Sequence, residues 1–317
     1  MKKRLNTIIA VILLVTSFVF TGCSKKVEPT DSSKVESRIN EYKDVDFLIS
    51  ADELKDILGN KDVLLFDCNK PEVYEKGHIP GAVNIGLQAF TRADGKIGEE
   101  GWGTIVDKEE LAKRLKNLGI DNDKTIVFYS DTTKGPGADG RAVWQLRMAG
   151  MDNVKFLNGG LTYWNEKGYE TTKEVSKAVP TTKEVVLKDY DTHNSTTKEE
   201  LYNNLGKEVL IDVRTEKEYK GSQDVGEPRG GHIKGAEFRL WQDLMYPNGV
   251  IKSKEEIKKI MAEHNVELGD TFCVYWTMGI RSGYVTMILE AVGFDNVKNY
   301  EGSIYEWGGD SSMPMEK

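Results

Sequence analysis

Short apolar runs alternate with amphipathic stretches along most of this chain. The apolar runs lie at residues 63–66, 125–129, 209–211 and 271–275. Runs of this length without polar alternation are typical of parallel strands that are covered on both faces. The amphipathic stretches lie at residues 109–118, 142–149, 254–264 and 284–292. This order of strand, loop, helix and strand predicts an α/β fold in which each parallel sheet is flanked by helices.

The pattern repeats itself along the chain. The segment MDNVKFLNGGLTYW begins at Met151, and FDNVKNYEGSIYEW begins at Phe294, 143 positions later. A second match joins LLFDCNKPEVYEKGHIPGA, around Asp67, to VLIDVRTEKEYKG…RGGHIKGA, around Asp212, with nine extra residues in the later copy. We therefore predict two homologous domains at residues 46–172 and 191–317, joined by a linker at residues 173–190.

The start of the chain has a different pattern. Three cations, Lys2-Lys3-Arg4, precede the apolar run 8–20. This predicts a signal peptide at residues 1–22. Residues 23–45 are polar, and we expect them to form a flexible tether, with structure beginning near residue 46.

The pair Thr21-Gly22 before Cys23 resembles a lipobox, with Phe20 where leucine is usual. Lipid on the Cys23 thiol would anchor the protein to the cell membrane at its extracytoplasmic face. The alternatives are an ordinary secretory peptide and a retained anchor. The apolar run is shorter than the roughly 18–20 residues that span a bilayer, which argues against the retained anchor.

The net charge and the cysteine content limit the kinds of partner and metal site that are possible. The net charge of −8 becomes −11 if residues 1–22 are removed, because they carry three cations and no acid. An acidic chain of this kind argues against nucleic acid as a partner. Beside Cys23, only Cys68 and Cys273 remain, which provides no disulfide framework and no zinc spacing. We expect no cofactor and no metal site.

Ordered motifs occur in both repeats: a strand ending in Asp, a Gly-His-Ile-x-Gly-Ala turn, a strand ending in Tyr, and an Asn-Val segment leading to Gly and Trp. This order resembles the rhodanese family over nearly all of the chain beyond residue 45. The spacing Gly-Glu-Pro-Arg-Gly-Gly-His in the second copy is similar to the two-domain thiosulfate and mercaptopyruvate sulfurtransferases. The resemblance implies a catalytically silent first domain and a second domain whose cysteine carries sulfane sulfur as a persulfide.

Persulfide chemistry needs a stabilised thiolate, which backbone N–H groups at a helix N-terminus and a nearby arginine can provide. The resemblance places this six-residue loop at Trp276-Thr277-Met278-Gly279-Ile280-Arg281, before a helix beginning near Ser282. Gly279 and Arg281 match the family pattern, but Trp276 stands at the position of the nucleophilic cysteine. An indole cannot take up and transfer sulfur, so the persulfide mechanism is excluded at this position. The loop could still bind a small anion through its N–H groups and Arg281, or the Trp276 ring could fill it.

No other nucleophile replaces the missing thiol. Cys68 and Cys273 are predicted to be buried strand residues. In the first repeat Ser130 stands at the cysteine position, and the sequence places no His or Asp to activate it. Residues 131–140 form too long a loop for a tight six-residue cradle, so we expect the first domain to be silent.

The other motif residues are predicted to be structural. In each repeat the turn histidine is expected to hydrogen bond to the aspartate that ends the preceding strand. These pairs are Asp67 with His78 and Asp212 with His232. Arg214 is expected to brace the second domain. Trp164 and Trp307, at matching ends of the repeats, are expected in the two cores.

Position 218 is a further departure. Animal-type sulfurtransferases have an arginine for the anionic donor there, whereas this chain has Glu218. Single-domain rhodaneses also carry glutamate at this place, so Glu218 alone does not exclude activity. Together with Trp276 it weakens the enzyme hypothesis.

Two functions follow from these residues. The missing thiol favours a non-catalytic homologue that binds a small sulfur-containing anion or a partner. The alternative is a sulfurtransferase that moves sulfane sulfur from thiosulfate or 3-mercaptopyruvate to a thiol acceptor. The sequence identifies no protein partner.

Overall fold

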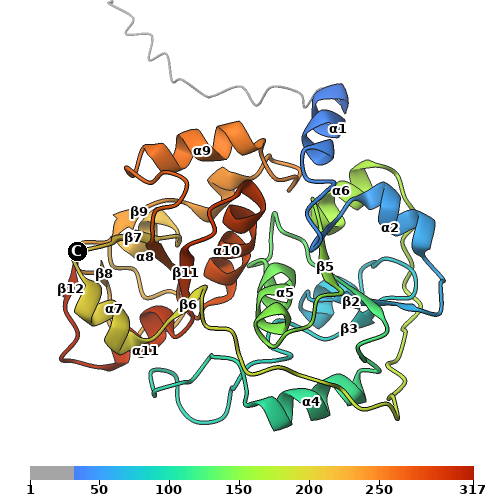
Figure 1. The fold of residues 1–317 in the computed structure, drawn as a ribbon, viewed down its shortest axis with the longest axis horizontal. Helices are drawn as coiled ribbons and strands as arrows, with labels where there is room; N and C mark the ends of the chain where they lie inside the picture. The colour runs from blue at the N-terminus through green and yellow to red at the C-terminus, as the bar shows by residue number, and fades with distance from the viewer. Residues whose placement is uncertain (1–31) are drawn as a thin grey trace, which may run out of the picture.

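The structure is a computed structural model that describes residues 32–317. The predicted signal peptide and Cys23 lie outside the described residues. Two α/β domains lie side by side, with helices α5 and α10 adjacent at the centre (Figure 1).

The first domain is built on a five-stranded parallel sheet in the order β1-β5-β4-β2-β3. Its strands are β1 (Leu48–Ile49), β2 (Val63–Asp67), β3 (Val83–Asn84), β4 (Thr125–Tyr129) and β5 (Val154–Leu157). Its helices are α1 (Ser32–Asn40), α2 (Ala51–Ile57), α3 (Pro71–Tyr74), α4 (Lys108–Asn117), α5 (Ala138–Met148) and α6 (Gly160–Glu166). Successive strand residues such as Leu65 and Phe66 belong to different buried clusters. Both faces of the sheet are therefore covered, which explains the apolar runs without alternation.

The second domain repeats this topology in the order β6-β11-β10-β7-β9, again with parallel pairs. Its main strands are β6 (Ser195–Thr196), β7 (Val209–Asp212), β9 (Glu237–Phe238), β10 (Phe272–Tyr275) and β11 (Val297–Tyr300). Its helices are α7 (Lys198–Asn204), α8 (Glu216–Tyr219), the 3-10 helix η1 (Trp241–Leu244), α9 (Lys254–Ala262), α10 (Ile280–Val292) and α11 (Ser303–Gly309). A small antiparallel pair joins β8 (His232–Ile233) to β12 (Met315–Glu316). The predicted α/β architecture with two tandem domains is confirmed.

Two helices begin four residues before the amphipathic stretches that predict them, although the loop pattern had already placed the start of α10 near Ser282. Helix α5 begins at Ala138 and α10 at Ile280, each after a glycine with φ of 76°. Gly137 and Gly279 provide this left-handed conformation at the helix start, which other residues adopt with strain. The amphipathic pattern was not visible in these first turns because α5 and α10 are buried on nearly all sides.

The domain interface is made by the close crossing of α5 and α10. A Cβ atom on Gly140 would lie 2.4 Å from Cδ2 of Tyr284, and a Cβ atom on Gly283 would lie 3.1 Å from Cγ of Arg141. These glycines let the helix backbones approach each other. One buried apolar cluster runs through both domains across this crossing. The two domains therefore share a core.

The predicted tether is wrong for residues 32–45. Helix α1 is ordered, and Val35 and Tyr42 are each only 2% exposed. Val35 packs in the first domain's core, while the Tyr42 hydroxyl donates to the Lys252 carbonyl of the second domain at 2.6 Å. Val35, Ile39 and Tyr42 recur at helical spacing. That apolar stripe is a signal that the polar composition of the segment obscured.

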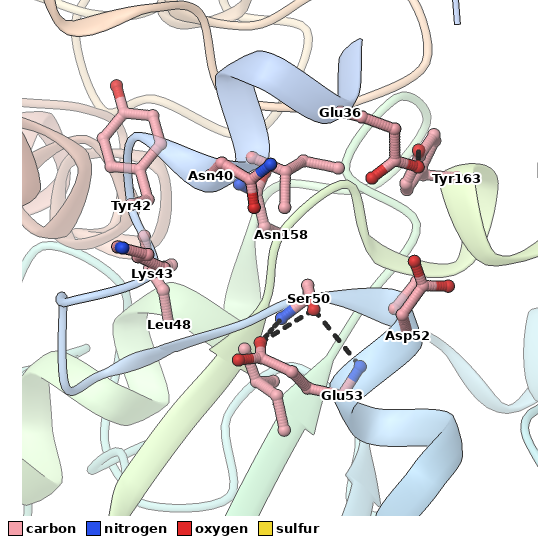
Figure 2. Close-up of a pocket in the computed structure, with 13 residues that line it drawn as sticks. Glu36, Asn40, Tyr42, Lys43, Leu48, Ser50, Asp52, Glu53, Asn158 and Tyr163 are labelled. Atoms are coloured by element: carbon pink, nitrogen blue, oxygen red, sulfur yellow. Dashed lines mark hydrogen bonds between the residues drawn. The ribbon is translucent and has the colours of Figure 1, made fainter. Parts of the chain in front are cut away.

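A cavity of about 190 Å³ lies between α1 and the start of α2 (Figure 2). Glu36 and Asp52 face this region from the two helices, and Lys167 bonds to both, at 2.8 and 3.1 Å. The Lys167 ammonium therefore links α1 to α2. Over residues 32–317, no helix is both long and apolar enough to cross a membrane.

Candidate functional site

The loop 276–281 connects the carboxyl end of β10 to the N-terminus of α10. Gly279 is required here, because a Cβ atom at this position would lie 2.5 Å from the Glu301 carbonyl oxygen. Among the described residues, the N–H groups of Thr277, Met278 and Gly279 have no backbone acceptor. The backbone thus keeps the donors that an anion cradle needs. The Trp276 N–H is used otherwise, since it donates to Oγ of Ser303 at 3.1 Å.

The Trp276 side chain is buried in the core that the two domains share. It is 6% exposed, and its Nε1 is buried without a hydrogen-bond partner among residues 32–317. The guanidinium carbon of Arg281 lies 4.6 Å from the centroid of the Trp276 ring. The last residue of the loop therefore folds back over the first, and the indole lies between this guanidinium and the buried core.

Glu218 forms an ion pair with Arg281, the cationic side chain of the loop. Its carboxylate lies 3.3 Å from Nη1 of Arg281 and accepts from Oγ1 of Thr277 at 3.2 Å. Burial would raise the pKa of Glu218, but hydrogen bonds from Thr215 and the nearby charges of Arg281 and Arg214 hold it below its usual value. Glu218 is therefore charged at neutral pH, and it offsets the positive charge that Arg281 would offer to an anion.

The first domain forms one wall of the site. Nε2 of Gln88 lies 3.4 Å from Sδ of Met278, and the Ile105 N–H donates to Glu301 at 3.0 Å. Beneath the loop, Arg141 and Glu301 form a buried ion pair of 2.8 Å across the domain interface. The geometry of the second-domain loop therefore depends on the first domain.

The predicted histidine–aspartate pairs are wrong. The ring nitrogens of His78 lie 2.9 Å from the Tyr74 carbonyl and 3.0 Å from the Glu174 carbonyl. Asp67 instead accepts the Asn69 N–H at 2.7 Å. Each turn histidine stacks on a tyrosine four or more residues earlier, with the His78 and Tyr74 ring centroids 3.6 Å apart. The histidines fix the turn through main-chain carbonyls and ring stacking.

The second domain repeats this correction. Nδ1 of His232 lies 3.0 Å from the Tyr219 carbonyl. Asp212 instead holds Arg214 through Nε and Nη2, at 3.0 and 2.7 Å, and accepts the Tyr275 hydroxyl at 2.8 Å. Arg214 is fully buried. Its guanidinium joins Asp212 at the strand end to the Gly231 carbonyl before the turn, which is the bracing role that the sequence predicts.

In the first domain a buried carboxylate lies beside Ser130, the counterpart of Trp276. Asp139, near the start of α5, accepts from Oγ of Ser130 at 2.7 Å and from the Ser130 N–H at 3.1 Å. Burial raises the pKa of Asp139 to about 6. The sequence placed no Asp beside Ser130, but the loop 131–137 returns the chain to this point and brings Asp139 there. Both side chains are buried, so a substrate does not reach the pair.

The two described cysteines are buried and free. Burial raises the pKa of both thiols well above its usual value. A neutral, inaccessible thiol is neither a nucleophile nor a metal ligand. Trp164 and Trp307 are buried as predicted, each with Nε1 donating to a carbonyl.

Sequence reasoning missed three side chains that border the loop. The centroid of the Trp241 ring lies 5.7 Å from the Arg281 guanidinium, Glu301 lies under the loop, and Glu227, in the insertion of the second repeat, is buried and interacts with Glu218. Glu301 stands in the repeated Asn-Val segment and Glu227 in the Gly-Glu-Pro-Arg-Gly-Gly-His motif, whereas Trp241 belongs to neither. These motifs and the extra residues of the second copy were the available signals for the two glutamates, since an insertion beside a site often serves it.

Comparison with known proteins agrees with this architecture. A family model described as Rhodanese-like domain matches residues 50–167 and 197–310. The chain is 31% identical over 288 residues to a thiosulfate sulfurtransferase of Corynebacterium glutamicum, covering 87% of this chain and 92% of that protein. It is 30% identical over 298 residues to the sulfur carrier protein TtuD of Thermus thermophilus, covering 87% and 98%. In fold it is similar to the anaerobic ergothioneine biosynthesis enzyme from Chlorobium limicola, with a TM-score of 0.75, 20% identity, and coverage of 86% of this chain and 70% of that one.

Proposed function

Because this chain belongs to the rhodanese family, we propose that it is a non-catalytic member, which binds a ligand or partner at the loop 276–281 without transferring sulfur. The observation that carries the proposal is the position of Trp276, buried beneath Arg281 where the nucleophile would stand. Sulfur transfer through a persulfide requires an accessible thiolate. Neither buried cysteine of the described chain offers one.

The surroundings of the loop also disfavour an anionic sulfur donor. The indole takes up space beside the loop, and Glu218 engages Arg281 at 3.3 Å. An incoming thiosulfate would therefore meet a carboxylate and an already paired guanidinium. Of the two binding modes that the sequence left open, the filled loop is better supported than the open anion cradle.

The test is thiocyanate release from thiosulfate and cyanide. The soluble fragment from Ser24 is compared with Trp276→Cys, and Ser130→Cys is the matched control that adds a thiol at the buried first-domain position. We expect no turnover by the unmodified protein or the control. Turnover only in Trp276→Cys would show a loop that lacks nothing but its nucleophile, whereas turnover by the unmodified protein would refute the proposal.

The alternative is a thiosulfate or 3-mercaptopyruvate sulfurtransferase. It is favoured by relatives named thiosulfate sulfurtransferase and sulfur carrier protein at about 30% identity, and by the free N–H groups of Thr277 to Gly279. It requires a sulfur-carrying group that the loop does not contain. Mass spectrometry of the protein after incubation with thiosulfate distinguishes the two, since a carrier would gain the mass of one sulfur atom.

We also propose export and lipid attachment at Cys23, at the extracytoplasmic face of the cell membrane. The support is the order of cations, apolar run and small residues before Cys23. Expression of the full chain in a bacterial host tests this. The wild type should fractionate with membranes and carry lipid, whereas Cys23→Ser should carry none.

A further inference from the structure

The side chains beside the loop 276–281 have the chemistry of a cation site. The Arg281 guanidinium lies 4.6 Å from the Trp276 centroid and 5.7 Å from the Trp241 centroid. Its Nη1 lies 3.3 Å from the Glu218 carboxylate. Indole faces next to a carboxylate attract planar or weakly hydrated cations, such as guanidinium and quaternary ammonium groups.

Arg281 is held in this place by few bonds. A guanidinium has five N–H donors, yet within residues 32–317 Nη1 alone finds an acceptor, and Nε is buried without one. The side chain is 19% exposed, so it has a path to solvent. A ligand cation can therefore replace the guanidinium, because Glu218 would form with the ligand the ion pair that it loses with Arg281.

A second carboxyl group, Glu227, interacts with Glu218. Glu227 is buried, and its Oε1 has no hydrogen-bond partner among the described residues. Burial raises the pKa of Glu227, and the neighbouring charge of Glu218 adds to this rise. A cation that binds beside Glu218 reduces the repulsion between the two carboxylates.

We propose that Trp276, Trp241 and Glu218 form a binding site for a small molecule carrying a guanidinium or quaternary ammonium group, and that Arg281 occupies this site until the ligand displaces it. This inference rests on the non-catalytic function proposed above and gives it a ligand class. The tryptophan at the nucleophile position then has a role of its own: it replaces a thiolate by an aromatic face that attracts a cation.

The test is isothermal titration of full-length protein in non-ionic detergent with methylguanidinium, with choline, and with 3,3-dimethylbutan-1-ol, the neutral isostere of choline. Arg281→Ala removes the internal occupant and should bind at least one of the cations about tenfold more tightly than the wild type. The matched control is Arg239→Ala, which removes an arginine of similar exposure, 21%, elsewhere in the second domain. This control should bind as the wild type does.

Adding Glu218→Gln to Arg281→Ala should weaken cation binding by about tenfold, since it removes the paired charge but keeps a capping acceptor for α8. The control is Glu256→Gln in the same background, which alters the equivalent capping carboxylate of α9 and should change nothing.

Three results would overturn the inference. They are equal cation affinity in wild type and Arg281→Ala, equal affinity for choline and its neutral isostere, and binding of thiosulfate or sulfate but of neither cation by folded Arg281→Ala. Circular dichroism establishes that each variant is folded. The non-catalytic proposal fails separately, since only turnover of thiosulfate by the wild type refutes it.

Discussion

The buried ion pair between Arg141 and Glu301 provides a direct test of how the two domains support the site. Both side chains are almost fully buried, and besides Arg141 at 2.8 Å the carboxylate accepts from Gln145 at 2.7 Å and Ile105 at 3.0 Å. Arg141→Met keeps the aliphatic volume but leaves this carboxylate without its cation. Removing one partner of a buried pair costs about 3–5 kcal/mol. We expect the free energy of unfolding to fall by that amount.

Urea unfolding measures the change, with circular dichroism and tryptophan fluorescence followed together to check for a single transition. The double variant Arg141→Met/Glu301→Gln should be at least about 1 kcal/mol more stable than Arg141→Met, because no buried charge is left unpaired. The partly exposed pair of Arg239 with Glu263 is the control, and Arg239→Met should cost below about 1 kcal/mol. A cost of Arg141→Met no greater than that of the control would refute the reasoning.

Three further predictions follow from buried groups. Because burial raises the pKa of Asp139 from 3.8 to about 6, the folded state binds the proton more tightly; stability should fall by on the order of 3 kcal/mol as pH rises from about 4 to 6. Asp139→Asn should lack this pH dependence in urea unfolding, and an unchanged profile would contradict the assignment. Tyr42→Phe removes the 2.6 Å hydrogen bond from the N-terminal segment to the second domain and should cost about 1 kcal/mol, whereas exposed Tyr202→Phe should cost nothing measurable. Cys68 and Cys273 should react with a thiol reagent only after unfolding, and fast labelling of the native protein would show that their burial is wrong.

Much of the fold follows from local pattern. The uninterrupted apolar runs identify the central strands β2, β4, β7 and β10, because parallel strands covered on both faces have no polar side. The repeat at 143 positions gives the two domains, and the two sheets indeed have the same strand order. The early start of α5 escaped prediction, because a helix buried on all sides has no amphipathic stripe; the start of α10 was placed near Ser282 only through the loop pattern.

The site was only partly predictable. The position of Trp276 in the loop follows from motif order alone. The contact of Glu218 with Arg281 does not, since 63 positions separate them. The same holds for Asp139, which the loop 131–137 brings to Ser130, and for the turn histidines, whose partners are main-chain carbonyls that no side-chain pattern reveals.

The sequence by itself determined the family, the tandem repeat and the presence of Trp276, rather than a cysteine, at the first position of the loop, since each of these depends on residue identity and order. Only the tertiary structure decided which side chains surround the loop 276–281 and how its charge is balanced. The Trp276 ring lies under the Arg281 guanidinium, Glu218 neutralises that guanidinium, and Glu301 supports the loop through an ion pair with the first domain. These relations join residues distant in the chain, and the physical reason they escape sequence analysis is that charge pairing and burial depend on proximity in space.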